Sequence, residues 1–196
     1  MSARGVDRTP IAEITDAADV GFGTFYNYFE SKDDLAAQVL DCVIDDLGRR
    51  NDAATAPLKG RNPAAVQAIS IRLTLREMLT NPMWKWWCRR PDLLAARLRH
   101  GFRRFGIRDL KLAVAAKRYA ISRRDVEAVW SLQMWMLAGG VREILEGEVA
   151  AMTEARLVAA IMRAMGLDPR RAKELSGIAL PSMPPPEIDF EFVSRG

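Results

Sequence analysis

The sequence predicts an all-α protein, with a small helix-turn-helix unit at the N-terminus and a larger helical domain after it. Apolar residues recur every three or four positions through most of the chain, as they do on the buried face of a helix. No segment alternates apolar and polar residues in the manner of a half-buried strand. Hydrophobic residues make up 49% of the 196 residues, which is enough for one or two domains with a sizeable core.

The helix-turn-helix unit begins with two short helices, expected at residues 10–18 and 21–29. Thr9 is placed to cap the first helix, because its side chain can accept a backbone N–H, and Pro10 has no N–H to leave unpaired. Asp19 falls between the helices, and Asp tolerates a left-handed backbone better than most residues. The sequence therefore predicts a sharp turn at Asp19.

The second short helix separates buried from exposed side chains. Phe25 and Phe29 stand four residues apart, so they share one helix face, which we expect to be buried. Gly21 and Gly23 each cost about 1 kcal/mol relative to Ala inside a helix. Close approach of another backbone would explain both glycines, because only glycine leaves that space.

A third helix is expected over residues 31–50, joining the two domains. Ser31 can cap it, and Asp33 and Asp34 suit the positive end of the helix dipole. Arg49 and Arg50 suit the negative end, so we expect the helix to end there.

The chain divides into a unit of residues 1–50, a helical domain of residues 51–180 and a tail of residues 181–196. A loop is expected at residues 51–61, because this stretch is rich in Ala, Gly and Pro. Further helices are expected at residues 62–81, 83–90, 93–105, 108–119, 123–146 and 154–165, followed by one short turn after Gly166. The tail is rich in proline, and we expect it to be flexible.

Residues 14–35 read ITDAADVGFGTFYNYFESKDDL. The pattern of the TetR family, IAxxAGVSxGTLYxHFxSKxxL, aligns with them without a gap. Residues 5–50 therefore resemble the DNA-binding domain of this family of one-component bacterial repressors, although Asp19, Gly21 and Tyr28 replace the usual glycine, serine and histidine. The resemblance implies a sequence-specific transcriptional regulator. Specifically, it implies a ligand-responsive repressor that acts as a homodimer on a double-stranded DNA operator.

The resemblance also assigns DNA contacts to individual residues. Phosphate or groove-wall contacts are implied for Thr24, Tyr26, Tyr28 and Lys32, and a phosphate contact for Thr9 at the start of the first helix. Positions facing the base edges are implied for Gly21, Phe22, Gly23 and Asn27.

Two features favour an alternative, a TetR-like dimer that binds a ligand or a protein but has lost DNA binding. The family places an amphipathic helix before the position of Gly5, whereas only four residues precede it here, so we expect the true start to lie upstream. Residues 1–50 also hold ten acidic residues against five Lys or Arg. DNA readers usually show a basic footprint.

Dimerisation is expected through the helices at residues 123–146 and 154–165. The first is too apolar to have only one buried face, and in TetR-like proteins the last two long helices pair across a two-fold axis. The expected interface residues are Val129, Met136, Leu157, Val158, Ile161 and Met165. Burial of the same residues within one chain is the alternative.

An effector chamber is expected between the helix-turn-helix unit and the two helices expected to form the dimer, residues 123–146 and 154–165. Its expected lining is Met78, Met83, Trp84, Trp87, Leu98, Phe102, Trp130 and Met134, with ordinary core packing as the alternative for each. Gly139 and Gly140 mark either a kink beside a pocket or a close helix crossing. Residues 85–124 hold thirteen Lys or Arg against two acidic residues. That charge suits an anionic effector such as an acyl-coenzyme A, or flanking DNA, or simply a solvated surface.

The sequence gives little support to an enzyme, which is the alternative from another class. His100 is the only histidine, and no nucleophile elbow, P-loop, zinc-type Cys/His cluster or HExxH occurs, so we expect no catalytic residue, metal or cofactor. Cys42 and Cys88 give no disulfide framework. No signal peptide opens the chain, and its apolar runs fall short of the ~20 residues that span a membrane. These features predict a cytoplasmic protein.

Overall fold

The computed structural model describes residues 5–147, 149, 152–188, 190, 192 and 194. Within these ranges the chain forms ten α-helices and one 3-10 helix, and no strand, which confirms the all-α prediction. The elements are α1 (Ile11–Ala17), α2 (Phe22–Tyr28), α3 (Lys32–Thr55), η1 (Ala56–Leu58), α4 (Pro63–Thr80), α5 (Pro82–Cys88), α6 (Pro91–Gly101), α7 (Arg103–Ala115), α8 (Val126–Glu146), α9 (Glu154–Ala164) and α10 (Pro169–Ser176).

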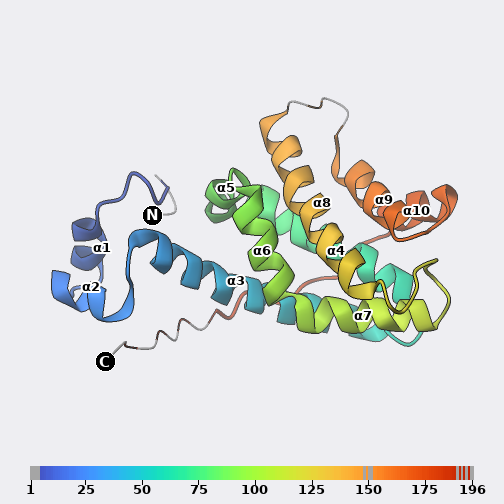
Figure 1. Ribbon diagram of the computed structural model, residues 1–196, viewed down its shortest axis with the longest axis horizontal. Coiled ribbons are helices and arrows are strands. Elements are labelled where there is room, and N and C mark those ends of the chain that lie inside the picture. The colour runs from blue at the N-terminus through green and yellow to red at the C-terminus, as the bar shows by residue number, and fades with distance from the viewer. Residues whose placement is uncertain are drawn as a thin grey trace.

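Helices α1 and α2 form a small head at one end of the molecule, and α3 connects it to the larger body (Figure 1). Phe25 and Phe29 are buried in the head core together with Leu35, as the i, i+4 spacing predicted. Asp19 adopts a φ of 52°, which confirms the left-handed turn between the two helices. Thr9 does not cap α1, so that prediction was wrong: its hydroxyl donates to the carbonyl of Gly5 at 2.9 Å.

Helix α3 begins as predicted but runs further than predicted. The Ser31 hydroxyl accepts from the Asp34 N–H at 3.1 Å, and the Asp34 carboxylate accepts from the Glu30 N–H at 2.9 Å, so both ends of the cap are satisfied. The predicted end at Arg49 and Arg50 was wrong, because the helix continues to Thr55. Arg50 does not cap a terminus; it is buried and donates to Asp46 at 2.7 Å.

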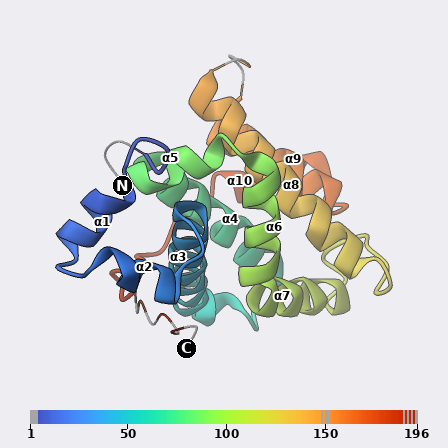
Figure 2. The ribbon, with the colours of Figure 1, turned by 60° about the vertical axis from the view of Figure 1, so that its left-hand side comes forward.

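Helix α4 lies at the centre of the body and packs against α3, α5, α7, α8, α9 and α10. Helix α8 crosses α6 on one side and α9 on the other (Figure 2). A Cβ on Gly140 would overlap the side chain of Leu157, so this glycine permits a close crossing of α8 and α9. Of the two explanations for the glycine pair, the crossing therefore accounts for Gly140.

Some boundaries differ from the predicted ones for reasons of packing. The break between α6 and α7 falls at Phe102, several residues earlier than predicted, and a Cβ on Gly101 would overlap Ile44 of α3. The short turn expected after Gly166 is the start of a full helix, α10, which Asp168 caps by accepting from the Arg171 N–H at 3.0 Å. The first boundary thus falls where α6 approaches α3 closely, and a local cap sets the second.

The apolar face of α9 is buried within its own chain, mainly against α10, α4 and α8. Leu157, Val158, Ile161 and Met165 are each no more than 3% exposed. The prediction that these four residues form a dimer interface was therefore wrong. Val129 and Met136 of α8 are partly buried against the same core.

The segment that follows α10 lies against the domain, whereas the sequence predicted a flexible tail. It passes back across the body and along α3 toward the head (Figure 1). Leu180, Met183 and Ile188 are partly buried against the main core. Prolines stand between these apolar residues, and residues 178–188 form neither helix nor strand, so the segment packs through its apolar side chains without regular structure.

Candidate functional site

Helix α2 presents an open, largely aromatic face. Phe22 is 54% exposed and Tyr26 is 48% exposed, and their rings meet edge to face with centroids 5.5 Å apart. Gly21, Gly23 and Asn27 are also exposed, while Thr24 and Tyr28 are half-buried. A Cβ on Gly23 would meet no described atom within 4 Å. The space beside Gly23 is therefore not filled by any described residue, and another molecule could approach the helix backbone there.

The other two residues expected to contact DNA are engaged within the head. The Lys32 ammonium donates to the carbonyls of Val6 and Asp7, each at 3.2 Å. Thr9 is 4% exposed, and its hydroxyl donates to Gly5. In this arrangement Thr9 is not open to a phosphate, contrary to the prediction.

The loop before α1 docks on α5 and fixes the head to the body. The Asp7 carboxylate accepts from the Trp86 indole N–H at 2.9 Å and from Arg90 at 3.3 Å. The Arg90 guanidinium lies 4.0 Å from the centroid of the Trp86 ring, in a cation–π contact. The tryptophan-rich α5 therefore supports the N-terminal loop.

The acidic residues of α3 pair with arginines of the basic segment. Asp41 pairs with Arg97, Asp45 with Arg104, and Asp52 with Arg108. Acidic residues of α3 thus lie opposite arginines of the basic segment, residues 85–124, which includes α6 and α7. Arginines held in these pairs are not free for an anionic effector.

A cavity of about 50 Å³ lies between α3, α4, α7 and α8. Of the eight residues expected to line an effector chamber, Phe102, Trp130 and Met134 line this cavity. The remaining lining residues are Gly48, Asn51, Asp52, Gln67, Ser70, Ile71, Thr74, Phe105, Gly106, Asp109, Gln133 and Leu137. This volume is about a third of the roughly 150 Å³ of a cavity that binds benzene, so a small aromatic ligand would have to enlarge the cavity, and an acyl-coenzyme A is far too large for it.

The other five expected lining residues do not line this cavity. Met78, Trp84 and Leu98 are fully buried in the core, which was the alternative for each. Met83 and Trp87 line a separate hollow beside the N-terminal loop. The structure therefore does not bring these five residues together with Phe102, Trp130 and Met134.

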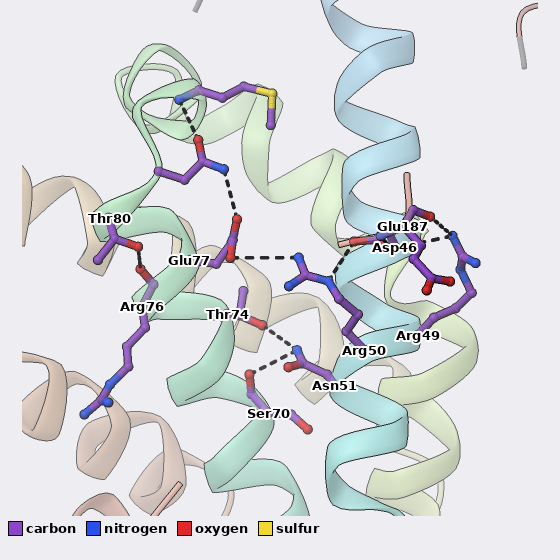
Figure 3. Close-up of polar contacts among 12 residues, drawn as sticks. Asp46, Arg49, Arg50, Asn51, Ser70, Thr74, Arg76, Glu77, Thr80 and Glu187 are labelled. Carbon is purple, nitrogen blue, oxygen red and sulfur yellow. Dashed lines mark hydrogen bonds and ion pairs between the residues drawn. The ribbon is translucent and has the colours of Figure 1, made fainter. Parts of the chain in front are cut away.

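Two buried amides of the cavity wall are held in fixed orientations by backbone carbonyls. Gln67 donates through Nε2 to the Gly106 carbonyl at 3.2 Å, so its Oε1 accepts from Gln133 Nε2 at 3.3 Å. Asn51 donates through Nδ2 to the Ser70 carbonyl at 3.4 Å and to Thr74 Oγ1 at 3.0 Å (Figure 3).

These orientations leave two acceptors without a partner. Gln133 Oε1 and Asn51 Oδ1 are both buried, and neither accepts a hydrogen bond from any residue that the structure describes. A buried acceptor without a partner costs about 1–3 kcal/mol. Both residues line the same cavity, so a molecule with two hydrogen-bond donors would bond both acceptors and remove both energetic costs.

Two carboxylates at the cavity wall share the Arg108 guanidinium. Burial raises the pKa of Asp109, although Arg108, whose Nη2 lies 2.8 Å from its carboxylate, opposes the rise. Burial alone would also raise the pKa of Asp52, but hydrogen bonds from Lys59 and Arg108 outweigh it and lower this pKa. The pKa values of the two acids are thus shifted in opposite directions, that of Asp109 upward and that of Asp52 downward.

Close approach at two glycines brings aromatic rings to the cavity. A Cβ on Gly48 would lie 2.5 Å from Phe105, and one on Gly106 would overlap Trp130. Trp130 is further fixed by its indole N–H, which donates to the Arg99 carbonyl at 3.0 Å. The cavity therefore combines aromatic walls with unpaired acceptors.

Sequence reasoning missed the polar half of this lining. Gln67, Thr74 and Gln133 are each no more than 3% exposed and stand among apolar residues on helices that are otherwise core. A polar residue within an apolar stripe was the available signal, because buried polar groups need partners. The expectation had instead followed the large aromatic residues.

Two family profiles match the chain. "Bacterial regulatory proteins, tetR family" matches residues 1–39, and "Tetracyclin repressor-like, C-terminal domain" matches residues 62–177. The chain belongs to the TetR family. As a TetR-family protein it is a transcriptional regulator and not an enzyme.

Solved structures of the TetR-family protein RolR are similar to this chain along nearly its whole length. Unliganded RolR is 27% identical with a TM-score of 0.84, covering 94% of each chain. RolR in complex with resorcinol is also 27% identical, with a TM-score of 0.78, covering 93% of this chain and 89% of the other.

A curated relative matches over a shorter stretch. The HTH-type transcriptional repressor DhaR of Mycobacterium sp. (strain GP1) is 39% identical over 61 residues, or 29% of this chain. The match spans 31% of the length of DhaR, so it supports the family assignment only locally. Within the described ranges, no helix of this TetR-family chain combines the length and apolarity needed to cross a bilayer.

Proposed function

We propose that this chain is a ligand-responsive repressor whose effector is a small aromatic compound with two hydrogen-bond donors. The unpaired acceptors of Asn51 and Gln133, both in one cavity, carry this proposal. Phe102, Phe105 and Trp130 supply the apolar wall that an aromatic ring would contact. The RolR complex with resorcinol, a dihydroxybenzene, supports the same ligand class.

The proposed DNA contacts lie on the open face of α2. Tyr26, Thr24 and Tyr28 would contact phosphates or the groove wall of a double-stranded operator, and Phe22 and Asn27 would face base edges. The exposed Gly21 and Gly23 would let the DNA backbone approach closely. Lys32 would approach a phosphate only if its present hydrogen bonds were exchanged. The protein would act in the cytoplasm, where the operator lies.

The proposed dimer surface is the exposed stripe of α8. Leu132 is 62% exposed and Trp135 is 51% exposed, although both are large and apolar. Gly139 follows on the same stripe, and a Cβ there would meet no described atom within 4 Å. Glycine costs about 1 kcal/mol inside a helix, and close packing of a second copy would offset that cost.

The cavity lies beside the helix that carries the head. Gly48, Asn51 and Asp52 belong to α3, which continues without a break to the head at Ser31. A ligand that prefers one position of α3 would shift the population of head positions, and in a dimer this changes the spacing of the two heads. Release from the operator follows when the favoured spacing no longer matches the half-sites.

One observation favours the alternative of a ligand-binding dimer without DNA binding. Residues 9–31, which hold both short helices, contain no Lys or Arg. The phosphate contacts would therefore depend on hydroxyls, backbone N–H groups and few cations, whereas counterion release usually supplies much of the affinity.

The test is fluorescence anisotropy with DNA from the protein's own promoter region, at several salt concentrations. We expect specific binding that resorcinol weakens and that 1,3-dimethoxybenzene, which has the same ring but no donor, leaves unchanged. Resorcinol binding by calorimetry without any DNA binding would establish the alternative. Failure of resorcinol and other dihydroxybenzenes to bind would refute the proposed ligand class.

A further inference from the structure

The segment after α10 makes specific polar contacts as it returns along α3. The carbonyl of Ile178 accepts from Arg72, at the start of the segment. The backbone N–H of Glu187 donates to Asp46 Oδ1 at 3.1 Å, and its carbonyl accepts from Arg49 at 3.4 Å (Figure 3). The segment is therefore fixed to α3 through its backbone, in addition to the apolar contacts of its side chains.

Beyond Glu187 the same segment reaches the head. The Phe192 ring meets Phe29 edge to face, with centroids 5.0 Å apart and an interplanar angle of 78°. The Phe190 ring stacks on Phe192 with centroids 6.2 Å apart. Phe29 belongs to the head core with Phe25, so Phe192 extends that core with a side chain from the opposite end of the chain.

Asp46 connects this segment to the wall of the cavity. Asp46 is 1% exposed and accepts from Arg50 at 2.7 Å, and Arg50 in turn approaches Glu77 of α4 at 3.8 Å. Asn51, which follows Arg50 in the chain, donates a hydrogen bond to Thr74 of α4, and its Oδ1 is one of the two unpaired acceptors of the cavity. A chain of contacts thus runs from Glu77 of α4 through Arg50 and Asp46 to Glu187 (Figure 3), and Arg50 precedes Asn51 of the cavity wall in the sequence.

We propose that residues 178–188, with Phe190 and Phe192, form a strap that clamps the head to α3 and regulates its position. The strap is a third connection between head and body, besides α3 itself and the loop bound to α5. Its anchor at Asp46 is linked through Arg50 to Glu77 of α4, which forms another wall of the cavity, so a shift of α3 against α4 on occupation of the cavity changes the hold of the strap on the head. This second step rests on the proposed function, whereas the clamping itself does not.

Hydrogen exchange on the full chain tests the clamp without ligand or DNA. Replacing Phe192→Ala removes the aromatic contact with Phe29, and we expect amide exchange in α1 and α2 to accelerate roughly tenfold. Phe190→Ala is the matched control, because this ring stacks on Phe192, makes no ring contact with Phe29 among the described residues, and is 48% exposed. It should have a much smaller effect, and exchange in α4 and α8 should not change in either variant. Equal protection of α1 and α2 in both variants and the wild type would overturn the clamp.

Variants of Arg49 test the anchor. Arg49→Ala removes the donor to the Glu187 carbonyl and should accelerate amide exchange at Glu187 and Ile188, which follow prolines that have no amide hydrogen, whereas Arg49→Lys keeps a donor and should restore part of the protection. Unchanged exchange in Arg49→Ala would contradict the anchor.

Resorcinol tests the coupling, with its binding measured separately by calorimetry. If resorcinol binds, exchange in α1 and α2 should change in the wild type and much less in Phe192→Ala. Binding without that difference would refute the coupling. If resorcinol does not bind, the proposed ligand class fails while the exchange results without ligand still decide the clamp.

Discussion

Replacing Gln133 with methionine separates ligand binding from stability at one position of the cavity. Methionine is close to glutamine in length and volume but offers no amide. The substitution removes the unpaired Oε1 of Gln133, which relieves about 1–3 kcal/mol. It also leaves Gln67 Oε1 without its donor, which costs about the same. We therefore expect the free energy of unfolding to change by less than about 1 kcal/mol.

Ligand affinity should respond much more strongly. In the wild type a ligand hydroxyl donates to Gln133 Oε1, which adds a hydrogen bond and relieves the unpaired acceptor. Losing both contributions costs about 2 kcal/mol, or roughly 30-fold in affinity for a dihydroxybenzene.

Calorimetric titration with resorcinol and urea unfolding of the same preparations measure the two quantities. Leu112→Met is the matched control, because it places the same side chain on the exposed face of α7, outside the cavity lining and the proposed dimer surface. An unchanged affinity in Gln133→Met, with stability intact, would refute the role of Gln133 as a ligand acceptor. A parallel loss of stability and affinity would instead assign Gln133 a structural role.

The remaining predictions concern the dimer, the DNA-reading helix and the two cavity carboxylates. Trp135→Glu should convert the dimer to a folded monomer, as measured by analytical ultracentrifugation. Leu112→Glu, on the exposed face of α7, should leave the dimer intact. A dimer that persists in Trp135→Glu would exclude the α8 surface as the interface. Tyr26→Phe should weaken binding to all DNA sequences by roughly 3- to 10-fold. Phe22→Ala should instead change the order of affinities among different operator sequences. Fluorescence anisotropy with a panel of operator variants measures both effects, and an equal loss of affinity for every sequence in Phe22→Ala would contradict its base-facing position. The pKa of Asp109 is raised, so its contribution to stability is present in acid and lost as the pH rises through the folded pKa; Asp109→Asn should therefore be more stable than the wild type at neutral pH and equal to it in acid. The pKa of Asp52 is lowered, so the stability that its ionised form contributes is present at neutral pH and lost as the pH falls through that pKa. Asp52→Asn should therefore be less stable than the wild type at neutral pH, by about 1 kcal/mol or less. Urea unfolding across the pH range measures the stability of both Asn variants.

The head could be predicted from the sequence because its contacts are local. Phe25 and Phe29 are four residues apart, and the cap formed by Ser31 and Asp34 spans three residues. Periodicity and capping rules operate over these distances. The exception at this end of the chain is Thr9, whose hydroxyl has a backward partner in Gly5 that capping rules do not anticipate.

The extension of α3 and the polar cavity wall could not be predicted in the same way. Arg50 is read as a terminal cation from sequence alone, and only its contacts with Asp46 and with Glu77 of α4 identify it as an interior residue. Gln133 and Gln67 are 66 residues apart, so their hydrogen bond exists only once α4 and α8 are packed. Large aromatic residues are ambiguous for the same reason, since Trp84 fills the core while Trp130 lines the cavity.

The position of α3 explains why its acidic residues need not oppose DNA binding. Asp41, Asp45 and Asp52 pair with arginines of α6 and α7, so their charge is largely neutralised before any operator approaches. The same pairs tie α3 to the helices that surround the cavity. A ligand between α3 and α7 must therefore act on a helix that is held by ion pairs along the side facing α6 and α7 and by the strap at Asp46. Exposed ion pairs are each worth little and are weakened by salt, so effector response should become easier as ionic strength rises, provided that α3 moves. Resorcinol titrations of operator release at increasing salt, compared between the wild type and Arg97→Gln, measure this dependence. A response that is identical in both proteins at every salt concentration would show that α3 does not move against α6.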